Sequence, residues 1–184
     1  MKSLLAVAVA AVMLLSGCAT GLETRADHDP SQNFSGYRTF AWIAEQPMMA
    51  SPEDMARVSP LNRRRIEQAI EKELARKGFQ QVPQGQAADF VVSYTVGARD
   101  RLDVQSYPVP YRGPWLWGWP YFGHDVDVTT YREGTLSIDV FDGKTHQPVW
   151  HGWATKRLSD SDARNAAELI PQAVSSILKR FPPR

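Results

Sequence analysis

The chain has 184 residues, with 21 basic and 20 acidic side chains, a formal net charge of +1 and a single cysteine. This balance of charge excludes the strongly basic field that would draw in nucleic acid. One cysteine excludes an intrachain disulfide, so the fold must depend on packing alone.

The N-terminal segment has the pattern of a secretory signal peptide. Lys2 supplies a positive charge, residues 4–15 form an almost unbroken apolar run, and Ser16-Gly17 lead into Cys18. The apolar run is too short to span a bilayer unaided. The segment resembles the bacterial lipobox, in which the cysteine thiol is alkylated with diacylglycerol and the leader is cut just before it. This resemblance implies lipid attachment at Cys18.

The residues after the cysteine indicate where the lipoprotein is sorted. Ala19 and Thr20 follow Cys18 and no aspartate does, which in Gram-negative lipoproteins resembles the default sorting to the outer membrane. Two or more fatty chains make a membrane anchor firm. We therefore expect residues 1–17 to be a signal peptide, and the mature protein to be anchored in the outer membrane and to face the periplasm.

The first part of the mature chain is predicted to hold a tether, a strand and a loop. Residues 18–32 are polar and without periodicity, which indicates a lipidated tether before a single domain at 33–184. Residues 34–43 alternate as a strand does. Residues 46–58, with two prolines, are predicted to form a loop.

A helix is predicted next. Ser59-Pro60 is a typical helix start, because serine caps the first turn and proline is tolerated there. Ile66, Ile70 and Leu74 then recur every four residues, which indicates one buried face. Gly78 is the expected stop.

Strands dominate the second half of the chain. Residues 90–96 alternate cleanly and are expected to continue through Val104, and residues 126–141 are expected to be extended with a bulge at Gly134. A turn at 142–148 leads to a return strand at 149–156.

A last helix is predicted to follow a polar cap at 159–162. Its apolar stripe reaches residue 181, and Pro171 is expected to kink or divide it. This order of elements predicts an α+β fold: a mainly antiparallel sheet of about four to five strands with two helices packed on one face.

Four short blocks of sequence share a resemblance to one family. They are Phe34-Ser35-Gly36-Tyr37-Arg38-Thr39-Phe40-Ala41-Trp42, Ala88-Asp89-Phe90-Val91-Val92-Ser93-Tyr94, Gly134-Thr135-Leu136-Ser137-Ile138-Asp139-Val140-Phe141-Asp142 with Trp150-His151-Gly152-Trp153-Ala154, and Ile177-Leu178-Lys179-Arg180-Phe181-Pro182-Pro183. In this order they are similar to the bacterial lipoproteins grouped as domain of unknown function (4136). The resemblance implies an envelope lipoprotein with an α+β domain and no established activity. We expect the aromatic residues of these blocks to fill the core and the glycines to allow close packing.

Residues 107–123 break the composition of the rest. The segment holds four prolines and three of the six tryptophans, at alternate positions. Because proline removes a backbone donor, we expect an aromatic Pro/Gly-rich loop between two strands. Trp115, Trp117, Trp119 and Tyr121 are the predicted contact residues, for an envelope protein, a glycan or the membrane surface. The alternatives are that these rings cover the domain's own sheet or that the loop is disordered.

The sequence holds no recognisable catalytic motif. The candidate metal ligands, His124-Asp125 with Asp127 and Asp27-His28-Asp29, lie in or near expected loops. A hydrolase that uses Asp139 or Asp142 near His146 or His151 is an open alternative, although the turn accounts for Asp142. We therefore predict no enzyme, no metal site and no cofactor.

These observations favour a non-enzymatic interaction or envelope-assembly module that contacts the membrane through Cys18. The alternative is a carrier of a small apolar ligand in a groove between helices and sheet, with the aromatic loop as its lid. A cavity beneath residues 107–123 would favour the carrier, and a projecting segment would favour the interaction module.

Overall fold

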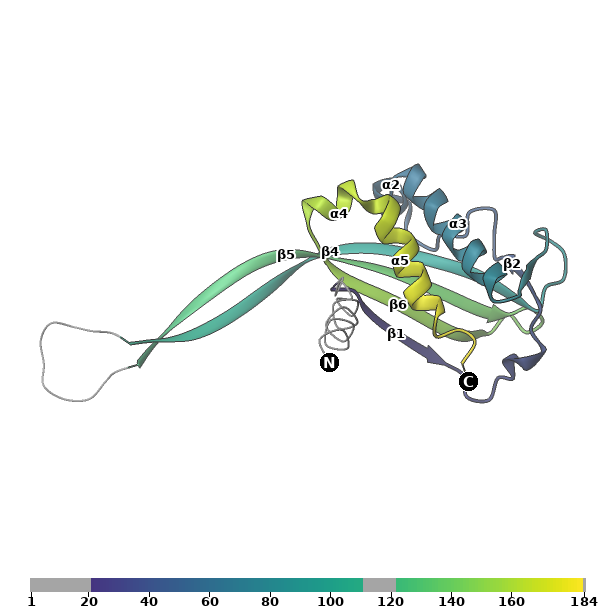
Figure 1. The fold of residues 1–184 in the computed structure, drawn as a ribbon, viewed down its shortest axis with the longest axis horizontal. Helices are drawn as coiled ribbons and strands as arrows, with labels where there is room; N and C mark the ends of the chain where they lie inside the picture. The colour runs from purple at the N-terminus through teal and green to yellow at the C-terminus, as the bar shows by residue number, and fades with distance from the viewer. Residues whose placement is uncertain (1–20, 111–121, 184) are drawn as a thin grey trace, which may run out of the picture.

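The computed structural model describes residues 21–110 and 122–183 (Figure 1). This part of the chain contains six strands, four α-helices and one short 3₁₀ turn. The elements in chain order are β1 (Glu23–His28), the 3₁₀ turn η2 (Phe34–Gly36), β2 (Thr39–Trp42), α2 (Pro52–Arg57), α3 (Pro60–Arg76), β3 (Gln80–Gln81), β4 (Phe90–Pro110), β5 (Phe122–Asp142), β6 (Pro148–Leu158), α4 (Asp160–Arg164) and α5 (Ala166–Leu178).

The strands form one mixed sheet in the order β1-β6-β5-β4-β2-β3. The neighbouring pairs β1–β6, β6–β5 and β5–β4 are antiparallel, whereas β2 runs parallel to both β4 and β3. Parallel neighbours need a crossover connection, and α3 provides it between β2 and β4. The predicted α+β class is confirmed, but the sheet is larger and more mixed than the four to five mainly antiparallel strands expected.

The core lies between the sheet and the helices α3 and α5. Alternate residues of the central strands, such as Phe90, Val92 and Ile138, are fully buried and belong to the same cluster as apolar side chains of the two helices. Phe181, just after α5, packs its ring against four other aromatic rings. These rings belong to Phe34, Phe79, Phe90 and Trp150.

The predicted start and stop of α3 and the polar cap of the last helical region are confirmed, but Ser59 makes no side-chain capping hydrogen bond. Pro60 is the first residue of α3, and Gly78 follows the helix with a φ of +91°, which glycine adopts without strain. Ser159 and Asp162 form a capping box at the start of α4. The predicted division at Pro171 is wrong: the last helical region divides at Asn165, between α4 and α5, and α5 runs through Pro171. Pro171 lies in the second turn of α5, close to the helix start, where few backbone N–H groups have an intrahelical acceptor.

Several predicted boundaries are wrong. Residues 23–28, expected in the tether, form the edge strand β1, which pairs with β6 from Glu23 to His28. An edge strand pairs on one side only, so polar residues suit it and the alternation is weak. The expected loop at 46–58 contains α2, and the expected strand at 34–43 is a strand only over Thr39–Trp42.

The two longest strands form an arm that leaves the body (Figure 1). β4 and β5 pair from Phe90 with Asp142 to Pro110 with Phe122, but β6 reaches only as far as Arg132 on β5. The ten pairs from Arg101–Tyr131 outward therefore form a two-stranded ribbon, about 30 Å long at ~3.3 Å per residue.

The arm corrects the predicted extent of the aromatic loop. Residues 107–110 and 122–123 belong to strands. Pro108 and Pro110 are compatible with a strand there, because among the described residues each strand of the ribbon pairs on one side only, and proline is accepted at an unpaired edge.

Candidate functional site

An apolar groove lies where the arm joins the body. Its volume is about 420 Å³, and it is lined by residues of α3, α4, α5, β4, β5 and β6 together with Leu22, just before β1. The apolar lining includes Val58, Ile66, Leu136, Leu158, Leu169 and Ile170. The size falls within the range of about 300–1,000 Å³ that is usual for small-molecule sites.

The charged residues of the groove balance one another. Lys156 and Asp162 form a close ion pair, with Nζ 2.8 Å from each carboxylate oxygen. Hydrogen bonds from Lys156 and from the Ser159 amide lower the pKa of Asp162 to about 2. Arg132 and Asp160 complete the charged lining, so the groove has no net charge to select an ionic ligand.

Gly134 allows the Leu158 side chain to pack directly against the backbone of β5 at the groove. A Cβ there would meet Leu158 Cδ1 at 2.8 Å. The predicted bulge at Gly134 is wrong, because this residue pairs regularly with Ala98 and Lys156. The register shift falls at Val140/Phe141 instead.

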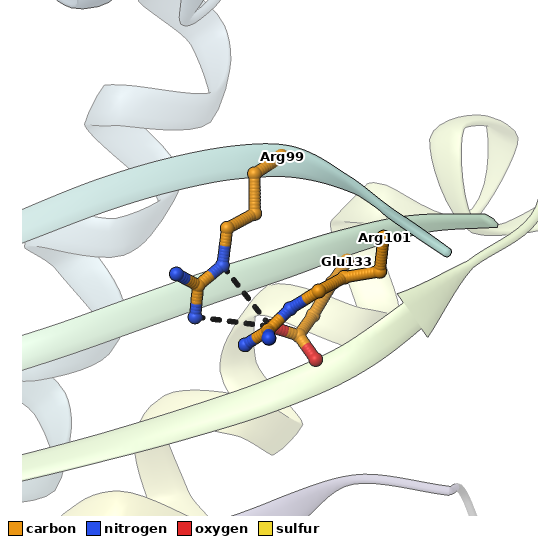
Figure 2. A network of polar contacts seen from close by, with 3 residues as sticks. All are labelled: Arg99, Arg101 and Glu133. Carbon is orange, nitrogen blue, oxygen red and sulfur yellow. Dashed lines mark hydrogen bonds and ion pairs between the residues drawn. The ribbon is translucent and has the colours of Figure 1, made fainter. Parts of the chain in front are cut away.

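A network of two arginines and one glutamate lies at the root of the arm. Figure 2 shows the guanidinium groups of Arg99 and Arg101 converging on Oε1 of Glu133. Arg101 Nη2 donates at 3.0 Å and Arg99 Nη2 at 3.4 Å, so the first contact is the stronger. The Glu133 side chain is only 17% exposed, whereas the two arginines are 44% and 65% exposed. One largely buried carboxylate therefore cross-links the two strands at the point where the third strand, β6, ends.

The structure brings together one of the predicted histidine–carboxylate pairs. Nδ1 of His151 lies 2.6 Å from Oδ1 of Asp139 on the neighbouring strand, and the imidazole stacks on the Trp153 ring. The His151 and Asp139 side chains are 46% and 24% exposed, and neither lines the groove. The pair thus lies on the open face of the sheet.

The other candidates from the hydrolase hypothesis have structural explanations. Asp142 Oδ1 accepts hydrogen bonds from the amides of Lys144 and Thr145, which fixes the turn as predicted. These bonds, led by that of Thr145, hold the pKa of Asp142 below its ordinary value. His146 lies in the same turn with a φ of 58° and is exposed.

The predicted contact and anchor residues Cys18, Trp115, Trp117, Trp119 and Tyr121 lie outside the described residues. His124, Asp125 and Asp127 are placed in β5 by their backbone alone. Among the side chains that the structure describes, which exclude residues 54, 103–110 and 122–128, no three histidine, cysteine or acidic groups lie close enough together to hold a metal ion. Within residues 21–110 and 122–183, no helix is both long and apolar enough to cross a membrane.

The groove lies between helices and sheet, as the carrier alternative expected, but its lining residues and the root network were not predicted. Isolated signals existed: Glu133 is followed by Gly134, and small residues recur along the last helix. Neither signal identifies its partners, because Arg99 and Leu158 are brought to this point only by strand pairing.

The fold and site define a small α+β domain with a helix-covered mixed sheet, a long two-stranded arm and an apolar groove at the arm's root. Residues 24–183 match the family described as Domain of unknown function (DUF4136), and the chain belongs to this family. A comparison with curated proteins gives no match.

Three solved structures are similar to this chain at low sequence identity, and the first of them shares its fold. A DUF4136 family protein from Bacteroides thetaiotaomicron superposes with a TM-score of 0.55 at 17% identity, over 88% of this chain and 96% of that one. A PDZ domain protein from Parabacteroides distasonis has a TM-score of 0.47 at 16% identity, over 90% of this chain and 36% of that one. The PelC dodecamer from Paraburkholderia phytofirmans has a TM-score of 0.47 at 14% identity, over 89% of this chain and 99% of that one.

Proposed function

We propose that this protein is an outer-membrane-anchored lipoprotein that faces the periplasm and acts as a non-enzymatic interaction or envelope-assembly module. The observation that supports the proposal most is the β4–β5 arm, which leads away from the body toward residues 111–121 (Figure 1). Those residues include Trp115, Trp117 and Trp119, side chains that favour interfaces because each ring is apolar and carries a polar N–H.

The arm has the features of an element that a binding partner would stabilise. An isolated two-stranded ribbon is marginally stable in water. Within the described residues no helix or third strand pairs with the arm beyond Arg132. Leu102 at its root is 68% exposed, so its apolar side chain is accessible to a partner. A contact along the arm would cover such apolar surface.

The position of β1 relates the arm to the proposed anchor. Glu23 begins β1 and pairs with Thr155 of β6, three residues before Leu158, which pairs with Arg132 at the arm's root. Glu23 lies five positions after Cys18, a distance of at most about 18 Å when the chain is extended. In the proposal, the lipid anchor therefore holds the root of the arm close to the membrane.

The absence of enzyme activity is part of the proposal. The hydrogen-bonded pair Asp139–His151 lies on the open face of the sheet rather than in a cleft. A catalytic pair gains most from a site that excludes water and holds the substrate on several sides. An exposed pair across two strands fits a cross-strand stabilising contact.

The anchor is tested by fractionating cells that express the full chain. Wild type is expected in the outer-membrane fraction and Cys18→Ala in the soluble periplasmic fraction. A Cys18→Ala protein that stays in the membrane would contradict lipid anchoring.

The contact role is tested by a photo-crosslinking amino acid at position 117. We expect a defined crosslinked species in wild type, and its loss after Trp115→Ser and Trp119→Ser with abundance and melting temperature unchanged. A large fall in melting temperature would instead mean that these rings cover the protein's own sheet.

A second candidate function is the carriage of a small apolar ligand, and the groove is the observation that favours it. Among the side chains that the structure describes, the lining reaches Ala98 on β4 and Arg132 on β5, at the root of the arm. Native mass spectrometry of the purified protein would detect a co-purified ligand, and its absence would contradict carriage.

A further inference from the structure

We propose that the apolar groove shelters one fatty acyl chain of the molecule's own lipid anchor while the protein is outside a bilayer. This inference rests on the proposed lipidation of Cys18. It assigns the groove to a segment of the same chain rather than to an external ligand.

The position of Leu22 is the main evidence that an acyl chain on Cys18 can reach the groove. Leu22 lines the groove and packs against the core cluster, next to the first residue of β1. Cys18 lies four residues earlier in the chain, which is at most about 14 Å of extended backbone. An acyl chain attached through the cysteine can therefore reach the groove without any rearrangement of the sheet or of the helices.

The lining suits an uncharged chain better than a charged ligand. Side chains from α3, α5 and the sheet supply apolar surface, among them Ile66, Leu136 and Ile170. Lys156 and Asp162 satisfy each other at 2.8 Å. A methylene chain in the groove would lose contact with water and would leave Lys156 and Asp162 paired with each other.

The groove would stabilise the acyl chain only while the protein is outside a membrane. Lipid tails are as apolar as the groove lining, so a chain gains little by leaving the bilayer for the protein. In water the balance is different, because each methylene that enters the groove removes apolar surface from solvent. The groove would thus hold an acyl chain during passage between membranes and release it when the anchor inserts.

The test uses a fatty acid that carries a photoactivatable diazirine, supplied to cells that produce the full chain. The purified lipoprotein is brought below the critical micelle concentration of its detergent, and the monomeric fraction is irradiated. Mass spectrometry then maps the crosslinked peptides. We expect crosslinks from the acyl chain on Cys18 to peptides of α5 and β6 in the same molecule.

Matched variants make the test specific. Ala166 is half-buried and lines the groove, whereas its neighbour Ala167 is exposed and does not. Ala166→Phe should abolish the groove crosslinks, and Ala167→Phe should retain them. Ala98→Trp fills the groove from an exposed position on β4, and it serves if Ala166→Phe fails to fold.

The possible results separate the two proposals. Crosslinks that are scattered over the surface, or equal in the Ala166 and Ala167 variants, would overturn the groove assignment and leave lipidation intact. A co-purified lipid that fills the groove and blocks the crosslinks would overturn it in favour of a carrier. No diazirine acid on Cys18 would overturn lipidation itself.

Discussion

The hydroxyl of Tyr37 donates a hydrogen bond of 3.0 Å to Oδ2 of Asp142, which lies 105 positions further along the chain. The other carboxylate oxygen of Asp142 accepts from the Thr145 amide at 2.8 Å. One side chain therefore links the segment after η2 to the turn between β5 and β6. Burial, followed by the bond to Asp142, raises the pKa of Tyr37, so its hydroxyl remains a donor at physiological pH.

Tyr37→Phe should destabilise the fold by about 1.5 kcal/mol, because a hydrogen bond to a charged acceptor is lost while the ring packing remains. The measurement is the urea unfolding midpoint at neutral pH. Tyr131→Phe is the control, since the Tyr131 ring contacts Arg157 through its face, which phenylalanine preserves. Equal midpoints for the two variants would show that the Tyr37 bond contributes nothing.

The stability of the protein should fall in acid partly through Asp162. Its pKa is lowered from 3.8 to about 2 in the folded state, first by the hydrogen bond from Lys156. A lowered folded pKa adds stability that is complete above the unfolded value and is lost as the pH falls through the folded value. The contribution should therefore disappear between about pH 4 and pH 2.

The melting temperature of Asp162→Asn should depend less on pH over this range than that of wild type, and at neutral pH it should be lower. Asp160→Asn is the control in the same helical turn, because Asp160 is exposed. A pH profile of Asp162→Asn that matches wild type would show that the ion pair with Lys156 does not stabilise the fold.

Gly152→Ala should destabilise the core by about 1–3 kcal/mol, the usual cost of overpacking. A Cβ at this position would clash with the Trp150 ring and would meet Ile177 at 2.8 Å. Thermal unfolding measures the effect. Gly36→Ala is the control, because its Cβ would meet nothing within 4 Å. A similar loss in both variants would show that the contacts with Trp150 and Ile177 are not the cause.

Glu133→Gln should loosen the root of the arm with little effect on global stability. Exposed ion pairs contribute only about 0.2–1 kcal/mol, and the two arginines that share Glu133 are largely exposed. We expect faster amide hydrogen exchange at residues 99–103 and 129–133 and an unchanged midpoint for the body. Asp100→Asn supplies the comparison, and protection that is unchanged in Glu133→Gln would argue against a role for the network.

Neither the wild type nor His151→Gln should hydrolyse chromogenic esters, phosphoesters or glycosides, because we propose that the protein is not an enzyme. The expected change is a loss of stability of about 1 kcal/mol or less, from the hydrogen bond to Asp139 and the contact with Trp153. Hydrolysis by wild type that His151→Gln abolishes would establish the pair as catalytic and contradict the proposal.

The helices with clear local signals were predictable. Ser59-Pro60, the recurrence of Ile66, Ile70 and Leu74, and Gly78 fall where the structure begins, buries and ends α3. The strand alternation around Val92 and Ile138 also indicated the buried face correctly. Each of these signals depends on residues close together in the chain. The groove and the network at the arm's root were not predictable in this way, because strand register alone brings Arg99, Glu133 and Leu158 together.

The amino-acid sequence by itself determined the α+β class, the family, the position of α3 and the burial of one sheet face, because helix caps and apolar periodicity are local properties of the chain. Tertiary structure alone decided that residues 23–28 close the sheet as β1, that the strands flanking residues 111–121 extend as an arm, and that Asp139 meets His151. The physical reason is that a polar strand has little apolar pattern of its own. Its place depends on hydrogen bonds to a neighbour that the sequence does not specify.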